Sequence, residues 1–284
     1  MMRRTTRTSK SSYDDPQEAD PAREGLSSVM IDVNVNLSRW PFRRLVGDEP
    51  SDLVAGLRKR DVTQACAGTF DGIFHKDISS ANARLAEDCH RYGASLLIPF
   101  GSINPKLPDW QEDLRRCHEV QKMPGIRLHP NYHGYDLKDP VFSELLHLAA
   151  ARRLVVQLVV CMEDERTQHP LMRVAPVDLS PLPDTLKSEP ATRLVVLNSD
   201  HVHNLANVQK LLSAGDAYFD ISMVEGVGGV ARLAQKISAQ RVLFGSNYPL
   251  FYFESAMLKV RESGFTDTDG QAVLGENARR LLAA

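Results

Sequence analysis

The sequence predicts a single α/β domain folded as a (β/α)8 barrel. Short apolar segments typical of buried strands alternate with helical patterns from residue 30 to the C-terminus. About eight such units in roughly 250 residues is the usual size of this barrel. A doubly wound parallel sheet is the alternative. It is disfavoured because no glycine-rich phosphate-binding loop follows any expected strand.

The composition is that of an ordinary globular protein, with 43% hydrophobic and 25% charged residues. A net charge of -2 gives no electrostatic reason to expect nucleic acid or membrane binding. No apolar run is long enough to cross a bilayer. The four cysteines lack metal-type or redox-type spacing, so we expect reduced thiols in a cytoplasmic protein. A homo-oligomer is compatible with this composition.

The first 27 residues are expected to form a disordered tail, followed by one barrel domain over residues 28–284. The tail is rich in Arg, Thr, Ser, Asp and Pro and has almost no apolar side chains. Its Arg3-Arg4 pair resembles the start of an export signal. We discount that interpretation because no apolar region follows before the first strand.

The strands are expected where apolar runs are bounded by turn residues: Met30–Leu37, Val62–Thr69, Ser95–Phe100, Gly125–Leu128, Leu154–Val160, Arg193–Leu197, Ala217–Ile221 and Arg241–Phe244. Helices are expected between them from apolar spacing and capping residues: Ser51–Arg60, Asp77–Tyr92, Asp109–Gln121, Pro140–Arg152, His203–Ala214, Val230–Ile237, Phe253–Ser263 and a closing helix within residues 269–284. The proline-rich segment 162–190 is expected to hold one short helix near Thr167–Arg173.

The first expected strand alternates strictly between apolar and polar side chains. Ile31, Val33 and Val35 should lie on one face, with an aspartate and two asparagines on the other. A buried amide without a partner costs roughly 1–3 kcal/mol, so these side chains need protein, water or ligand partners. The alternative is that both asparagines only cap neighbouring loops.

Polar residues recur at the expected C-terminal ends of the strands, where barrels of this kind carry their active sites. They are Asn34, Asn36, Arg127, His129, Gln157, Asn198, Asn247 and Tyr248, with His201 and His203 just beyond the sixth strand. For each single histidine a structural role is the alternative. Together the residues favour a ligand-binding mouth.

Four segments resemble one known family. The run Asp32-Val33-Asn34-Val35-Asn36 resembles Asp-x-His-x-His, the first-strand signature of the amidohydrolase superfamily. Residues 241–249 are similar to its eighth-strand signature, which ends Gly-Ser/Thr-Asp-x-Pro. Residues 125–130 and 273–282 are similar to the amidohydrolase-related (amidohydrolase 2) TIM-barrel branch. That branch contains decarboxylases of the carboxymuconate-semialdehyde type and a pyrone-dicarboxylate lactonase.

The resemblance implies that every metal ligand of the family is replaced here. Its histidines correspond to Asn34, Asn36, Asn198 and either Val159 or Gln157, and its aspartate corresponds to Asn247. Neutral amides do not compensate the charge of a buried dication. Without the metal there is no water of lowered pKa, and an amide is no general base. We therefore expect no metal and no cofactor, and a neutral hydrogen-bonded network in the old metal cavity.

Three functions are compatible with this pattern. The first is a metal-independent hydrolase or carbon–carbon lyase acting on a small carboxylated substrate. Its proposed catalytic residues are His129, His201 and Asn247, and its proposed substrate-binding residues are Asn34, Asn36, Arg127, Gln157, Asn198 and Tyr248. The second is a catalytically inactive pseudoenzyme that binds a small anionic metabolite or a protein partner. The third is a metal enzyme with unconventional ligands.

An anionic ligand is expected because cationic side chains collect near the strand ends. Arg127 would grip a carboxylate with its planar fork, and Arg43 would add to a net cationic mouth. The alternative is internal pairing. Arg127 would then form a salt bridge with Asp32, and the other cations would pair with acids close in sequence, including Glu163.

Overall fold

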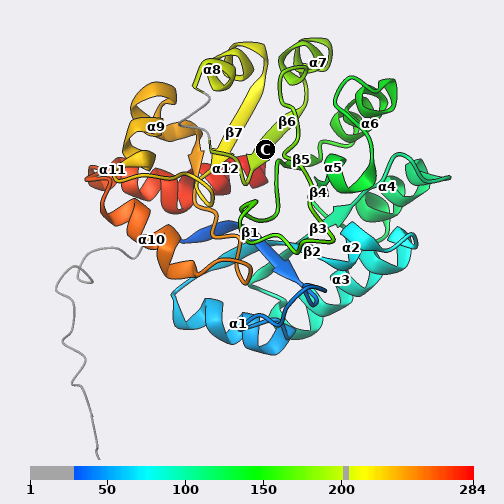
Figure 1. Cartoon of the computed structure of the whole chain (residues 1–284), viewed down its shortest axis with the longest axis horizontal. Helices are drawn as coiled ribbons and strands as arrows, with labels where there is room; N and C mark the ends of the chain where they lie inside the picture. The colour runs from blue at the N-terminus through cyan, green and yellow to red at the C-terminus, as the bar shows by residue number, and fades with distance from the viewer. Residues whose placement is uncertain (1–28, 201–204) are drawn as a thin grey trace, which may run out of the picture.

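Eight parallel strands form one closed barrel in the computed structural model, which describes residues 29–200 and 205–284 (Figure 1). The strands pair in chain order: β1 (Ile31–Leu37), β2 (Gln64–Thr69), β3 (Leu97–Ser102), β4 (Gly125–Leu128), β5 (Val155–Val159), β6 (Arg193–Leu197), β7 (Asp216–Asp220) and β8 (Val242–Leu243). Closure between β8 and β1 comes from backbone hydrogen bonds of 2.9 Å, from Val33 N to Phe244 O and from Asn36 N to Tyr248 O. The predicted barrel is confirmed.

Helices follow the strands along the chain, and most of them cover the outside of the barrel: α1 (Pro50–Lys59), α2 (Asp71–Phe74), α3 (Ile78–Gly93), α4 (Trp110–Glu119), α5 (Pro130–His133), α6 (Pro140–Ala151), α7 (Leu182–Ser188), α8 (Leu205–Ala214), α9 (Gly229–Ile237), α10 (Phe253–Arg261), α11 (Asp267–Gln271) and α12 (Asn277–Ala283). A π-helical turn, Ala272–Glu276, joins α11 to α12. The expected disorder of residues 1–27 and the expected helix start at His203 concern residues outside the described ones. None of the described helices is long and apolar enough to cross a membrane.

The prediction of a short helix near Thr167–Arg173 is wrong. That segment turns instead, and the Gln168 side chain bridges it by bonding both the N–H and the carbonyl of Val174. Pro170 lies in the middle of the expected helix, where a proline removes a helical hydrogen bond. The helix forms later as α7, with Pro183 in its first turn, where a missing N–H costs nothing.

Strand β1 is irregular, and this changes which side chains face the barrel interior. Its pairing with β2 shifts between Asp32 and Val35. Ile31 ahead of the shift and Val33 within it pack in the inner hydrophobic cluster, whereas Val35 after it packs in the outer cluster between sheet and helices. The expectation that all three share one face is therefore wrong. An extra residue in a strand re-aims the side chains that follow it.

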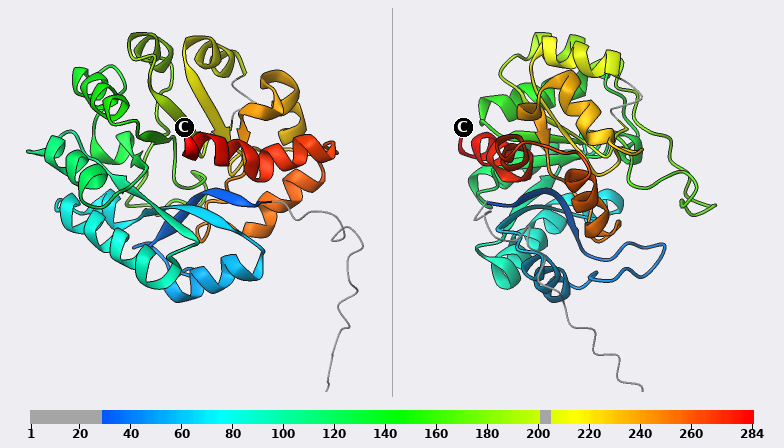
Figure 2. Two further views of the ribbon diagram at one scale, coloured as in Figure 1. Left: turned by 180° about the vertical axis from the view of Figure 1, so that it is seen from behind. Right: turned by 90° about the vertical axis from the view of Figure 1, so that its left-hand side faces the viewer.

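The C-terminal segment closes the end of the barrel opposite the long loops, as the right-hand view of Figure 2 shows. Leu281 of α12 packs in the inner cluster, and its carbonyl accepts a 2.9 Å hydrogen bond from Arg193 at the start of β6. The π-helical turn approaches the chain ahead of β1 so closely that a Cβ on Gly275 would lie 1.8 Å from the carbonyl oxygen of Val29. Only glycine fits at this contact.

We predict that Gly275→Ala lowers the free energy of unfolding by about 3 kcal/mol or more, because backbone must move to relieve the overlap. Gly270→Ala is the control, since the nearest atom to its added Cβ would be 3.9 Å away. It should be neutral or stabilise by up to about 1 kcal/mol. Urea denaturation of both variants measures this, and equal stabilities would show that the close contact is absent.

Candidate functional site

The four asparagines expected at the barrel mouth come together in two hydrogen-bonded pairs. Asn34 Nδ2 donates to Asn198 Oδ1 at 2.6 Å, and Asn36 Nδ2 donates to Asn247 Oδ1 at 3.0 Å. All four side chains are buried. Asn198 and Asn247 both have a φ of 55°, a left-handed conformation that asparagine tolerates better than most residues. Residue type at these two positions therefore serves the backbone as well as the network.

The first pair continues onto β7 through a carboxylate that the sequence analysis did not single out. Asn34 Nδ2 also donates to Asp220 Oδ2 at 3.0 Å, and the backbone N–H of Asn198 donates to Asp220 Oδ1 at 2.9 Å. Ser222 Oγ completes this side by donating to Asn198 Oδ1 at 2.7 Å. The available signal was the single acid within the apolar run Phe219-Asp220-Ile221.

The second pair continues to the segment that follows β5. Asn247 Nδ2 donates to the carbonyl oxygen of Met162 at 3.1 Å. Asn36 Oδ1 accepts a 2.9 Å hydrogen bond from Arg127 Nη1. Both asparagines therefore use N–H groups and oxygens within the protein. The network also includes the charged Arg127 guanidinium, so it is not the purely neutral network expected from the sequence.

Arg127 lies across the interior of the barrel, 1% exposed, with five hydrogen bonds. Nε donates to Gln157 Oε1 at 2.8 Å, and Nη1 donates to Val35 O at 2.8 Å besides Asn36 Oδ1. Nη2 donates to the carbonyl oxygens of Cys66 (2.9 Å) and Val33 (3.3 Å). A guanidinium has five N–H donors, so all are used.

This geometry supports neither role considered for Arg127. A carboxylate anchor needs free donors, and the guanidinium has none left. No carboxylate lies within ion-pair distance of Arg127 among the described residues, so the alternative pairing with Asp32 is also not formed. Gln157 shares this interior position, since its Nε2 donates to Val33 O at 2.9 Å.

His129 is buried at the end of β4, and neither of its ring nitrogens has a hydrogen-bond partner in the described part of the chain. Burial holds the pKa of His129 well below its ordinary value, and nearby His133 and Arg127 lower it further. The imidazole is therefore neutral at pH 7. Its expected catalytic role stays a prediction, and the one assigned to His201 concerns a residue outside the described ranges.

The structure places Tyr248 in the outer hydrophobic cluster, away from the asparagine pairs, and its expected ligand contact stays a prediction. Its ring belongs to the outer hydrophobic cluster, with the guanidinium carbon of Arg60 5.4 Å from the ring centroid. The phenol approaches α1, where a Cβ on Gly56 would lie 3.0 Å from its oxygen. Because consecutive residues of an extended chain point to opposite sides, placing Asn247 inside sends Tyr248 outside.

The carboxyl groups of Asp32 and Asp220 are buried near Arg127 and act electrostatically on its positive charge without contacting it. Burial raises the pKa of Asp32 to about 7, against the opposing effect of hydrogen bonds from Ser246 and Asn34. Burial likewise raises the pKa of Asp220. The pKa of Arg127 falls to about 10 through burial, so the guanidinium is charged at neutral pH.

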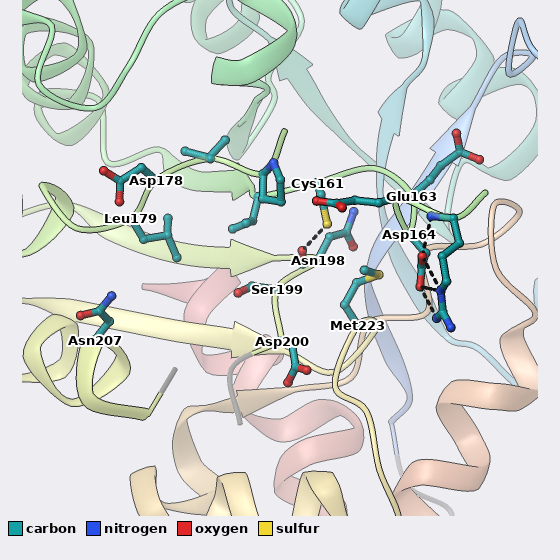
Figure 3. A pocket seen from close by; sticks show the side chains of 15 residues that line it. Cys161, Glu163, Asp164, Asp178, Leu179, Asn198, Ser199, Asp200, Asn207 and Met223 are labelled. Atoms are coloured by element: carbon teal, nitrogen blue, oxygen red, sulfur yellow. Dashed lines mark hydrogen bonds and ion pairs between the residues drawn. The ribbon is translucent and has the colours of Figure 1, made fainter. Parts of the chain in front are cut away.

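A cavity of about 580 Å³ opens beside this network, at the C-terminal ends of β5, β6 and β7 (Figure 3). This is the size of many small-molecule sites. Asn198 reaches its wall from the network, and Cys161 Sγ donates to the Asn198 carbonyl at 3.1 Å. The described lining is acidic: Glu163, Asp164, Glu165, Asp178 and Asp200 carry five carboxylates, and Arg166 is its one cation.

The expected net cationic mouth is therefore wrong for the described residues. Arg127 is enclosed in the barrel rather than facing the cavity. Arg43 pairs with Glu163, as the internal-pairing alternative held. Arg166 pairs with Asp164. The pKa of Asp178 is held below its ordinary value by hydrogen bonds from Ser180, so this carboxylate is ionised at neutral pH.

Comparison with known proteins identifies the class. The chain belongs to the amidohydrolase family, whose sequence profile, described as Amidohydrolase, matches residues 53–283. This confirms the predicted amidohydrolase-related branch. A search of curated proteins found no match.

Solved structures with the same fold include decarboxylases. The 5-carboxyvanillate decarboxylase LigW from Sphingomonas paucimobilis has a TM-score of 0.70 over 90% of this chain and 99% of its own. The 2,6-dihydroxybenzoate decarboxylase from Rhizobium has a TM-score of 0.68 over 89% and 99%. A dihydroxybenzoic acid decarboxylase from Polaromonas, with bound manganese and an inhibitor, has a TM-score of 0.67 over 90% and 97%. Each is 12% identical to this chain, which shows the shared fold.

The described residues at this end of the barrel do not fit a metal ion such as the manganese of the Polaromonas structure. Asn34 and Asn36 point N–H donors at the oxygens of Asn198 and Asn247, whereas a metal needs lone pairs converging from anionic or imidazole ligands. Within residues 29–200 and 205–284, no group of three or more His, Cys, Asp or Glu could hold a metal ion.

We predict that Asp32→Asn flattens the pH dependence of stability. With a folded pKa near 7 and an unfolded pKa near 4, the folded protein holds an extra proton between these values, so wild-type stability falls as pH rises through this window. The contribution of Asp32 is on the order of 4 kcal/mol. Urea denaturation from pH 4 to 8 measures it.

The control is Asp184→Asn, at a carboxylate that is 88% exposed, which should keep the wild-type slope. Asparagine at position 32 can still accept from the Ser246 and Asn34 backbone N–H groups, so folding is retained. Identical slopes in wild type and Asp32→Asn would mean that this carboxyl is ionised across the whole range.

Proposed function

We propose that this amidohydrolase-family barrel binds a small molecule in the cavity at the ends of β5 to β7 and does not turn it over by the metal-dependent chemistry of its relatives. One observation carries the proposal: the asparagines at the positions that the sequence resemblance assigns to metal ligands bond one another. These amide side chains provide no Lewis acid, and an amide accepts no proton near neutral pH.

The lining of the cavity favours a ligand with positive charge or several hydrogen-bond donors. A ligand carboxylate, as expected from the sequence, would need a free cation, and Arg43 and Arg166 are both engaged by acids. Glu165 and Asp178 have no ion-pair partner within 4 Å among the described residues. Their charge would attract an ammonium group and repel a carboxylate.

We predict that amines raise the melting temperature of the full chain and carboxylates do not. Benzylamine and an aliphatic diamine, compared with benzoate and a dicarboxylate, are suitable probes in a thermal-shift assay at low ionic strength. An amine at about 100 times its dissociation constant adds about 2.7 kcal/mol, or roughly 5–10 °C for a domain of this size.

Asp178→Asn should reduce the amine-induced shift, whereas Asp184→Asn, at an exposed residue outside the cavity lining, should leave it unchanged. A shift produced by the carboxylates instead would contradict the assigned ligand class. Shifts of equal size in the two variants would place the amine outside this cavity.

A second candidate function is a metal-independent hydrolase or carbon–carbon lyase on a small carboxylated compound. The observation that favours it is His129, buried, neutral and without a hydrogen-bond partner in the described ranges, and therefore able to accept a proton from a bound molecule. His201 and Asn247 would complete its catalytic set, with Asn34, Asn36, Asn198 and Gln157 orienting the reacting groups.

We predict no loss of CO2 and no hydrolysis when the chain is incubated with carboxylated aromatic acids and lactones, measured by product analysis in the presence and absence of manganese. Turnover that disappears in His129→Asn would establish the second candidate and reject the first. Turnover that requires manganese would reject both.

A further inference from the structure

A chain of hydrogen bonds links the centre of the barrel to the wall of the cavity. It runs from Arg127 Nη1 to Asn36 Oδ1 (2.9 Å), from Asn36 Nδ2 to Asn247 Oδ1 (3.0 Å), and from Asn247 Nδ2 to Met162 O (3.1 Å). Met162 lies between Cys161 and Glu163, which both line the cavity (Figure 3). The backbone of this wall is therefore attached to the barrel interior.

Arg127 is fixed by the irregular part of β1. Where β1 loses its regular pairing with β2, the carbonyl oxygens of Val33 and Val35 accept from the guanidinium, and so does Cys66 O on β2. One side chain from β4 thus joins both strands around the irregularity. A guanidinium with all five donors used has a single orientation, which it imposes on Asn36.

Gly68 on β2 provides the space for this arrangement. A Cβ at this position would lie 2.7 Å from Arg127 Nη1 and 2.8 Å from its Cδ. An arginine free to move would avoid such a contact easily. Arg127 cannot, because each displacement breaks hydrogen bonds inside the barrel.

We propose that Arg127 is the positioning residue of the cavity, holding the wall around Cys161 through Asn36 and Asn247, and that Gly68 is required for it. This role rests on the proposed function in one respect only, namely that this cavity is the ligand site. Its test needs no ligand, so it can fail or succeed independently of ligand binding.

The reaction of Cys161 with a thiol reagent reports the position of the wall. Cys161 is 7% exposed, whereas Cys66, Cys89 and Cys117 are 2% exposed or less. Native full-length protein is treated with iodoacetamide, and the labelled cysteine is identified by mass spectrometry. Arg127→Lys keeps the positive charge but loses the planar guanidinium. In this variant iodoacetamide should label Cys161 about tenfold faster than in wild type, the factor for losing about one net hydrogen bond.

Gly68→Ala should accelerate Cys161 labelling in the same way, because it displaces an unchanged Arg127. Leu85→Ala in α3 is the control for general destabilisation, since Leu85 is buried in the outer cluster and is not part of the cavity lining. It should lower the melting temperature without selective labelling of Cys161. Selective acceleration in both Gly68→Ala and Arg127→Lys supports the proposal.

A double-mutant cycle on melting temperature tests the role of Gly68. Gly68→Ala should lower the melting temperature by about 5 °C in the wild-type background. In the Arg127→Lys background, Gly68→Ala should lower the melting temperature much less. Lysine lacks the five hydrogen bonds of the guanidinium and can move away from the added methyl group. Equal costs in both backgrounds, or labelling of Cys161 at the rate seen in Leu85→Ala, would overturn the proposal.

Discussion

The burial of one guanidinium constrains most of what lies inside this barrel. A charge removed from water is tolerated only where it is fully hydrogen-bonded. Arg127 meets that condition with oxygens supplied by β1, β2 and β5. The irregularity in β1, the glycine at position 68 and the amide oxygen of Asn36 are all needed for it. The interior around Arg127 is therefore a hydrogen-bonded polar network rather than an open reaction chamber.

Charge balance in the interior is indirect. Asp32 and Asp220 are buried on β1 and β7, and each accepts hydrogen bonds from serine or asparagine groups rather than from arginine. Their attraction to Arg127 acts through the low-dielectric interior, where it is screened little. Because burial raises the pKa of Asp32 to about 7, the ionisation of Asp32 and the net charge of the interior change with pH near neutrality. Burial raises the pKa of Asp220 as well.

The fold could be predicted because strand length, strand order and connection type follow from local patterns. The same patterns place Asn34, Asn36, Asn198 and Asn247 at one end of the barrel, and the structure brings them into contact. The interior direction of Arg127 also follows from strand phase. These features depend on the alternation of side chains and on parallel pairing, which local sequence encodes well.

Other features depend on tertiary contacts that a local pattern does not contain. The shift in β1 moves Val35 to the outer layer, although the run from Ile31 alternates regularly. The position of Tyr248 just after the eighth strand predicts a side chain at the barrel mouth, but its ring packs on α1. The acidic cavity forms because the segment after β5 lies against the end of β6. The prolines of this segment do not indicate that arrangement in the sequence.

We propose that amide side chains occupy the metal position of the family in this barrel. Crystals grown with excess manganese and measured at its absorption edge test it directly. The account predicts no anomalous peak among Asn34, Asn36, Asn198 and Asn247, with the Asn34–Asn198 and Asn36–Asn247 hydrogen bonds intact at 2.6 and 3.0 Å. A fully occupied manganese peak there, with the asparagine oxygens turned toward it, would contradict the account.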